Sequence, residues 1–172
     1  MIELYEGVPG SGKSYHAVCE KFLPWVKQGR RLYIAVNGIY LDRLSLFTGI
    51  DLPVLEQQIT LWKDSAEVLQ AFPYVEPGSA VIIDEAQTVF RSMQKVEPGL
   101  LRWLETHRHY GVDILLMSQD FRQMSQGVTR LIEATVKFRK LSFVGLSKKY
   151  QGKVRGNPED NELIRAFVGT YS

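Results

Sequence analysis

Residues 2–14 read Ile-Glu-Leu-Tyr-Glu-Gly-Val-Pro-Gly-Ser-Gly-Lys-Ser, and this stretch decides the fold. Residues 2–6 predict a strand, residues 7–12 form a glycine-rich turn, and residues 13 to about 27 predict a helix that Pro24 would kink or end. Residues 7–14 also match the G-x-x-x-x-G-K-[ST] pattern of a phosphate-binding loop, the Walker A motif, in the strand–turn–helix setting that such a loop requires. We therefore predict a P-loop nucleotide-binding domain.

The chemistry of phosphate binding explains these residue types. Glycines let the backbone wrap around phosphate without a clash from Cβ, so successive N–H groups point inward, and the following helix adds its positive end. Lys13 is expected to reach the β- and γ-phosphates, and the Ser14 hydroxyl to take a place on Mg²⁺. We expect ATP with Mg²⁺ to be bound by Gly7, Pro9, Gly10, Ser11, Gly12, Lys13, Ser14 and Tyr15.

An acidic pair follows a second apolar run, as in a Walker B motif. Residues 80–83 read Ala-Val-Ile-Ile, typical of a strand buried on both faces, and Asp84 and Glu85 come next. Asp84 is expected to orient Mg²⁺ through a water shared with Ser14, and Glu85 to polarise the attacking water as general base. The alternative for the pair is a solvated loop.

Two further polar groups are candidates for catalysis. The strand predicted at residues 112–117 ends at Ser118-Gln119, and Gln119 could sense the γ-phosphate or simply cap a buried strand. Arg108 lies near the end of a helix that Pro98 begins and Gly111 follows. It could reach a neighbouring subunit's γ-phosphate, a role for which Arg91, Arg102 and Arg122 compete.

The remaining chain alternates strand-like and helix-like segments. Residues 32–36 predict a strand, residues 41–72 are hard to interpret but suggest a helix around 55–62, and residues 136–141 predict a half-exposed strand. This pattern indicates an α/β fold, a three-layer sandwich with a mainly parallel central sheet. At 172 residues the chain suits one domain, with a core at about 1–145 and a basic extension at about 146–172.

Composition excludes several classes of protein. The net charge is +2, too mild by itself to imply nucleic-acid binding; the single cysteine excludes an internal disulfide; and no apolar run is long enough to span a membrane. A basic group toward the end could still contact single-stranded DNA, with Phe138 and Tyr150 stacking on bases. The alternative is a solvated edge strand protected by charge. The group comprises Lys137, Arg139, Lys140, Lys148, Lys149, Lys153 and Arg155.

Three segments together resemble the Zot family, which includes zonula occludens toxin and the filamentous-phage morphogenesis proteins known as protein I. They are GVPGSGKSYHAV at residues 7–18, VIIDEAQTVF at 81–90 and THRHYGVDILLMSQD at 106–120. The resemblance covers roughly residues 1–145. It implies an ATPase of the additional-strand-catalytic-glutamate type, in which the sensor strand lies between the phosphate-loop strand and the Asp-Glu strand. Gln119 would then lie between Lys13 and Glu85.

The resemblance also implies a role and partners. Family members act as assembly factors on the cytoplasmic side of the bacterial inner membrane, where they help to extrude phage DNA while coat proteins are added. An ATP-driven motor assembled as a homo-oligomeric ring is the first hypothesis, and a non-catalytic nucleotide-binding scaffold is the alternative. A small-molecule kinase and a helicase fit less well. The family's membrane helix and periplasmic tail are not found in these 172 residues, so membrane contact would need a segment beyond them, and no toxin activity is inferred.

Overall fold

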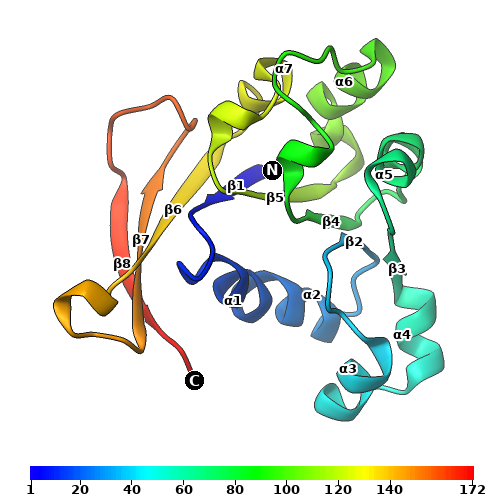
Figure 1. The fold of residues 1–172 in the computed structure, drawn as a ribbon. Coiled ribbons are helices and arrows are strands. Elements are labelled where there is room, and N and C mark those ends of the chain that lie inside the picture. Colours follow the sequence, from blue (N-terminus) through cyan, green and yellow to red (C-terminus); the bar gives the residue numbers. More distant parts are fainter.

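One eight-stranded sheet organises the protein (Figure 1). The computed structural model describes all residues, 1–172. The strand order is β3-β2-β4-β5-β1-β6-β7-β8, and the first six strands in that order are parallel, whereas β7 and β8 are antiparallel additions at one edge. The strands are β1 (Ile2–Glu6), β2 (Leu32–Ala35), β3 (Ile59–Leu61), β4 (Ala80–Ile83), β5 (Asp113–Ser118), β6 (Ala134–Lys140), β7 (Lys149–Arg155) and β8 (Arg165–Thr170).

Helices cover both faces of the sheet, which makes the predicted three-layer sandwich (Figure 1). One core contains Ile2 and Leu4 and packs beneath α5, α6 and α7; the other contains Tyr5 and Met117 and packs beneath α1 to α4. Alternate residues of each buried strand supply the two cores because successive side chains point to opposite faces. The helices are α1 (Lys13–Ala17), α2 (Leu23–Lys27), α3 (Leu41–Thr48), α4 (Leu52–Gln58), α5 (Ser65–Ala71), α6 (Pro98–Glu105) and α7 (Gln126–Thr129).

The order of the central strands is the one that the sequence resemblance implied. β5 lies between β1 and β4, with Tyr5 opposite Met117 and Ile83 opposite Leu116. All three strands are parallel, so their carboxyl ends meet at one edge of the sheet. The phosphate loop after β1, the acidic pair after β4 and Gln119 after β5 therefore all start from that edge. The additional-strand arrangement of a P-loop NTPase is confirmed.

Two local predictions differ from the structure. Residues 59–61 form strand β3, not part of a helix, because α4 ends at Gln58 and the next residues pair with β2. Of the two effects expected of Pro24, a kink or an end, the end is wrong: a π-helical turn (Val18–Phe22) connects α1 to α2, and Pro24 falls in the first turn of α2. Proline is tolerated there because its missing N–H would have no partner in any case.

The basic extension supplies strands β7 and β8. Six residues of β7 pair with β6, from Tyr150 opposite Lys140 to Arg155 opposite Thr135, and β8 then pairs with β7. The prediction of a half-exposed strand at residues 136–141 is confirmed by β6, which has both buried and exposed residues. The alternative of an edge strand is wrong for β6, because β1 and β7 flank it on both sides. Separately, no helix combines the length and the apolar composition that a bilayer crossing requires.

Candidate functional site

The loop between β1 and α1 has the backbone of a phosphate cradle. Gly10 and Gly12 adopt left-handed conformations, with φ of +76° and +99°, which side chains with a Cβ rarely take. Gly7 N–H donates to Ser118 O at 3.1 Å, which ties the loop to the end of β5. His16 N–H donates to Gly12 O at 2.9 Å, so α1 begins directly at the end of the loop. The sequence pattern and the backbone geometry therefore agree.

A pocket of about 330 Å³ opens over this loop. The side chain of Lys13 is buried and its Nζ donates to Gly7 O at 3.1 Å, so the ammonium group lies over the loop. Ser11 Oγ is buried without a hydrogen-bond partner, which is unusual for a polar atom and suits a site built for an anionic ligand. The pocket is lined by Val8, Pro9, Gly10, Ser11, Gly12, Lys13, Ser14, Tyr15, Asp84, Glu85 and Tyr171.

The acidic pair forms the opposite wall of the pocket. Burial raises the pKa of Asp84, although the backbone N–H of Glu85, which donates to Asp84 Oδ1 at 2.8 Å, and the nearby Lys13 both oppose that shift. Glu85 is exposed and has φ of +49°, a left-handed conformation that costs energy for a residue with a Cβ. Asp84 is half-buried and accepts a backbone hydrogen bond, whereas Glu85 is exposed, so the two adjacent carboxylates have different environments, as separate roles would require.

The residues also fit Mg²⁺ bound together with a phosphate. Nowhere in the protein do three His, Cys, Asp or Glu side chains cluster to hold a metal ion by themselves. Mg²⁺ is commonly held by one or two carboxylates plus substrate phosphates. Ser14 and Asp84, which share the pocket, supply an exposed hydroxyl and a carboxylate. They are the residues that would complete such a site.

A hydrogen-bonded relay connects Glu85 to the middle strand of the site. Gln87 Nε2 donates to Glu85 Oε2, and Ser118 Oγ donates to Gln87 Oε1 at 3.0 Å. Ser118 is fully buried at the end of β5. Sequence reasoning did not single out Gln87, although its place two residues after Glu85 in the Asp-Glu-Ala-Gln run was the available signal.

Gln119 is placed less closely than the sequence suggested, whereas Arg108 lies away from the pocket of its own chain, which its predicted action on a neighbouring subunit allows. Gln119 follows β5 at the expected edge, but its side chain is exposed and does not line the pocket. Arg108 lies in the turn before β5, at the opposite edge of the sheet, where it forms an ion pair with Glu133. Neither residue is brought into the phosphate pocket of its own chain.

The competing arginines lie on other surfaces. Arg122 is exposed, and its Nη2 donates to Asp120 Oδ2 at 2.7 Å. This hydrogen bond holds the pKa of Asp120 below its usual range. Arg91 lies after the acidic pair, where its backbone forms an isolated antiparallel β-bridge with Met124. Arg102 is exposed on α6. Arg122 is the one of these that directly follows the middle strand of the site.

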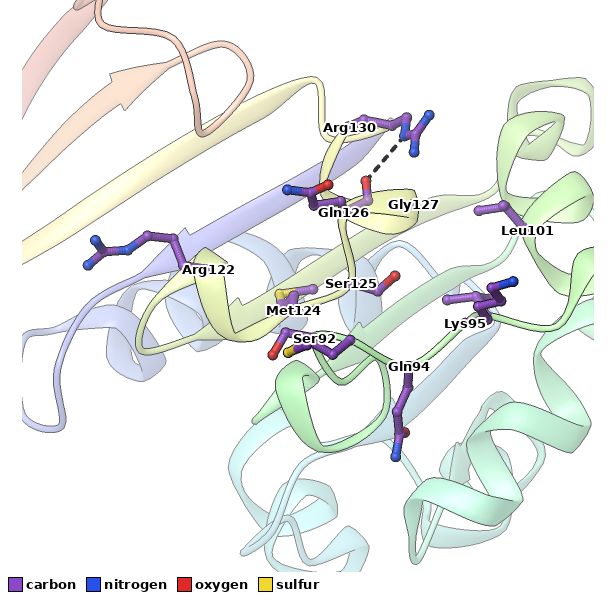
Figure 2. Close-up of a pocket in the computed structure, with 12 residues that line it drawn as sticks. Ser92, Gln94, Lys95, Leu101, Arg122, Met124, Ser125, Gln126, Gly127 and Arg130 are labelled. Atoms are coloured by element: carbon purple, nitrogen blue, oxygen red, sulfur yellow. Dashed lines mark hydrogen bonds between the residues drawn. The ribbon is translucent and has the colours of Figure 1, made fainter.

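A larger groove, of about 750 Å³, lies between the segments that follow β4 and β5 (Figure 2). Its walls are residues 92–96, which follow the acidic pair, and residues 122–130, which follow β5. Figure 2 shows its cations Lys95, Arg122 and Arg130 spread around the rim without converging on one point. A compact phosphate site needs convergent donors, so this groove is not an alternative phosphate cradle.

The structure separates most basic residues of β6 and β7 from the aromatic residues between them, the exception being Lys140, which lies opposite Tyr150. Phe138 and Tyr150 are each only 3% exposed and pack against His16 of α1. The prediction that they stack on bases is therefore wrong. Lys137 and Lys153 face each other across the strand pair, on the other face of the sheet.

Comparisons with known proteins agree with the motifs. The family model for zonular occludens toxin (Zot) matches residues 1–171. The chain is 27% identical over 164 residues to the Gene 1 protein of Xanthomonas phage phiLf, covering 88% of this chain and 37% of that protein. It is 26% identical over 170 residues to a putative assembly protein of Pseudomonas phage Pf3, covering 94% of this chain and 50% of that protein. The chain thus spans half or less of the length of these relatives.

Solved structures share the fold over nearly the whole chain. The N-terminal domain of zonular occludens toxin from Neisseria meningitidis superposes with a TM-score of 0.63 at 20% identity, covering 99% of this chain and 93% of that one. The genome-packaging NTPase B204 of Sulfolobus turreted icosahedral virus 2, solved in complex with AMPPCP, gives a TM-score of 0.62 at 16% identity, covering 100% and 97%. At these identities the likeness shows a P-loop NTPase fold.

Proposed function

Because the chain belongs to the zonular occludens toxin (Zot) family, we propose that it binds and hydrolyses ATP as a motor domain in filamentous phage assembly. The observation that carries the proposal is that Asp84 and Glu85 line the same pocket as the phosphate loop, although more than seventy residues separate them along the chain. A loop that only bound phosphate would need no carboxylate facing it. A site that hydrolyses ATP needs both a phosphate loop and carboxylates that face it.

The residues divide the chemistry as follows. Backbone N–H groups of the loop and the Lys13 ammonium hold the phosphates, and Ser14 and Asp84 hold Mg²⁺, which neutralises charge on the β- and γ-phosphate oxygens. Glu85 accepts the proton of the attacking water. Gln119 orients that water from the end of β5, after a rotation of its exposed side chain.

The test of hydrolysis is a substitution at Glu85. Glu85→Gln is expected to lower kcat by about 10²- to 10⁴-fold while ATP still binds, because the general base is lost and the phosphate cradle is intact. Glu105→Gln, on the exposed side of α6, is the matched control. Unchanged phosphate release by Glu85→Gln would remove Glu85 from the mechanism. ATP binding without any phosphate release by the unmodified protein would favour the alternative, a non-catalytic scaffold that ATP orders.

We further propose that the working form is a homo-oligomeric ring in which Arg108 acts on the neighbour's γ-phosphate. Its position at the edge opposite its own site supports a role in trans, once the ion pair with Glu133 opens. Lys13→Ala and Arg108→Ala proteins, each inactive alone, are expected to regain turnover when mixed, because some interfaces then have an intact cradle and an intact arginine. Mixing that restores nothing contradicts the role, and Arg122 is then the next candidate.

The relatives support a proposal about partners. The Pf3 protein is named a putative assembly protein, and we propose that this chain likewise acts with phage assembly and coat proteins, on the cytoplasmic side of the bacterial inner membrane. Contact with single-stranded DNA is proposed for the exposed face of β6 and β7. Lys137 and Lys153 face each other there, and a phosphate backbone would relieve the repulsion that remains after Lys137 pairs with Glu6, at 3.7 Å between Nζ and Oε1.

Salt dependence tests the DNA contact. Lys149→Ala with Lys153→Ala is expected to weaken binding at low salt and to reduce the slope of log K against log [salt] by about 1 to 2, because two phosphate contacts are lost. Lys27→Ala, an exposed lysine on α2, is the control. If the unmodified protein shows no affinity for single-stranded DNA at low salt, the DNA proposal ends and the ATPase proposal stands.

A further inference from the structure

The pocket over the phosphate loop has an aromatic end. The phosphate and Mg²⁺ chemistry described above gives these aromatic side chains no role. Tyr15 and Tyr171 line this pocket together with the loop, and both side chains are partly exposed. Tyr15 directly follows Ser14 on α1, whereas Tyr171 comes just after β8, more than 150 residues later. The charged lining residues are Lys13, Asp84 and Glu85, which belong to the phosphate and metal chemistry.

The two rings are held in fixed places by the sheet extension. Their centroids lie 5.3 Å apart at 60°, and the buried ring of Tyr150 lies 5.2 Å from Tyr171 and 6.2 Å from Tyr15. Tyr171 N–H donates to Lys148 O at 2.9 Å, and Ser172 N–H donates to the Tyr15 hydroxyl oxygen at 3.0 Å. Neither ring needs to be ordered when a ligand arrives, which lowers the entropic cost of binding.

Tyr171 contacts the phosphate loop directly. Its hydroxyl donates to Gly10 O at 3.4 Å, so the ring stands beside the tip of the cradle. A flat group joined to phosphates held by the loop would therefore meet this ring. Aromatic side chains attract nucleobases by stacking, which needs no particular hydrogen-bond pattern on the base.

We propose that Tyr171, supported by Tyr15, is the platform on which the base of the bound nucleotide stacks. The inference rests on the proposed function, since it names the part of the nucleotide that this end of the same pocket recognises. The competing explanation is that Tyr171 only fastens β8 to the phosphate loop through its hydroxyl. Stacking depends on the aromatic ring, whereas fastening depends on the hydroxyl, so the two are separable by substitution.

The experiment compares ATP with inorganic tripolyphosphate, which has the phosphates and no base. Affinities are measured by calorimetry in magnesium buffer, with the full chain. The unmodified protein is expected to bind ATP about tenfold more tightly than tripolyphosphate, since stacking on one aromatic ring contributes on the order of 1–3 kcal/mol. Tyr171→Leu is expected to remove that preference and leave tripolyphosphate binding intact, whereas Tyr171→Phe keeps the preference.

Controls keep the outcomes distinct. Tyr74→Leu changes a tyrosine that is 83% exposed and outside the pocket, and is expected to leave both affinities unchanged. Thermal melting checks that each variant is folded; leucine is chosen because it still packs against Tyr150. Equal binding of ATP and tripolyphosphate by the unmodified protein, or an unchanged preference in Tyr171→Leu, overturns the base platform and leaves the ATPase proposal standing. Loss of the preference in Tyr171→Phe shows a fastening role instead. Absence of binding by both ligands ends both proposals.

Discussion

Replacing Gly12 by alanine tests the close packing between the phosphate loop and the antiparallel extension. Gly12 has φ of +99°, and an added Cβ would lie 2.5 Å from Cγ of Tyr150 on β7. The alanine therefore meets two separate costs, a strained backbone and a clash with a buried ring. Gly29 provides the matched control, because its φ is +73° and nothing lies within 4 Å of an added Cβ.

The expected magnitudes follow from these two positions. Left-handed backbone costs a residue with a Cβ about 1–2 kcal/mol, which is the whole cost expected for Gly29→Ala. Gly12→Ala adds about 1–3 kcal/mol for forcing extra volume into a packed region, for a total of about 3.5 kcal/mol. In a domain of this size each kcal/mol lowers Tm by about 2–4 °C. Gly12→Ala should thus lower Tm by about 10 °C and Gly29→Ala by about 5 °C.

The assay is thermal unfolding of both variants without nucleotide, followed by the same pair in a Tyr150→Ala background. With the ring removed, Gly12→Ala should cost no more than Gly29→Ala, since only the backbone strain remains. Equal Tm values for the two single variants would refute the close approach of Tyr150 to the loop. ATP binding by Gly12→Ala should be lost in either background, because the added Cβ also alters the cradle.

Three further perturbations have defined outcomes. Burial raises the pKa of Asp84, so above that pKa the ionised side chain lowers the free energy of unfolding. Asp84→Asn should therefore raise Tm at neutral pH in EDTA, while weakening Mg²⁺-dependent nucleotide binding. A lower Tm would contradict this account. Burial also lowers the pKa of His16 from its ordinary value of 6.5. The folded state then binds fewer protons than the unfolded state, so stability should fall as pH drops below about 6.5. His16→Gln should reduce that slope in pH-dependent melting curves and leave the part due to His107, whose pKa burial also lowers. The exposed His109→Gln should leave the slope unchanged. Gln87→Ala removes the relay to Glu85 and should lower kcat by about tenfold or more with little change in KM, given 1.5–3 kcal/mol for a hydrogen bond to a charged group. A change confined to KM would show that Gln87 acts on nucleotide binding instead.

The phosphate loop could be predicted from the sequence because all its determinants are local. The glycines, Lys13 and Ser14 occupy eight consecutive positions, and the strand before them and the helix after them follow from short-range patterns. The acidic pair was predicted in the same way, from the end of one apolar strand. That these two segments line one pocket was an expectation from the motif and the resemblance, and the parallel order of β1, β5 and β4 provides it.

The partners of the catalytic groups could not be predicted in this way. Gln87 meets Ser118 because β4 and β5 are neighbours, and Tyr171 meets Gly10 because β8 folds back along β7. Residues 59–61 show the same limit, since pairing with β2 made a strand of a segment that suggested a helix. Contacts over such separations depend on which strands pair, and strand pairing is decided by packing of the whole chain.

The sequence by itself determined the phosphate cradle, the acidic pair and the α/β class, because each motif, and each strand or helix in the alternating pattern, rests on residues a few positions apart. Only the tertiary structure decided which face of β6 and β7 is buried. Alternation already separated Phe138 and Tyr150 from their basic neighbours, but it could not say which set faces solvent. The packing of His16 against those two rings settles it, because apolar rings gain free energy only where another element removes them from water.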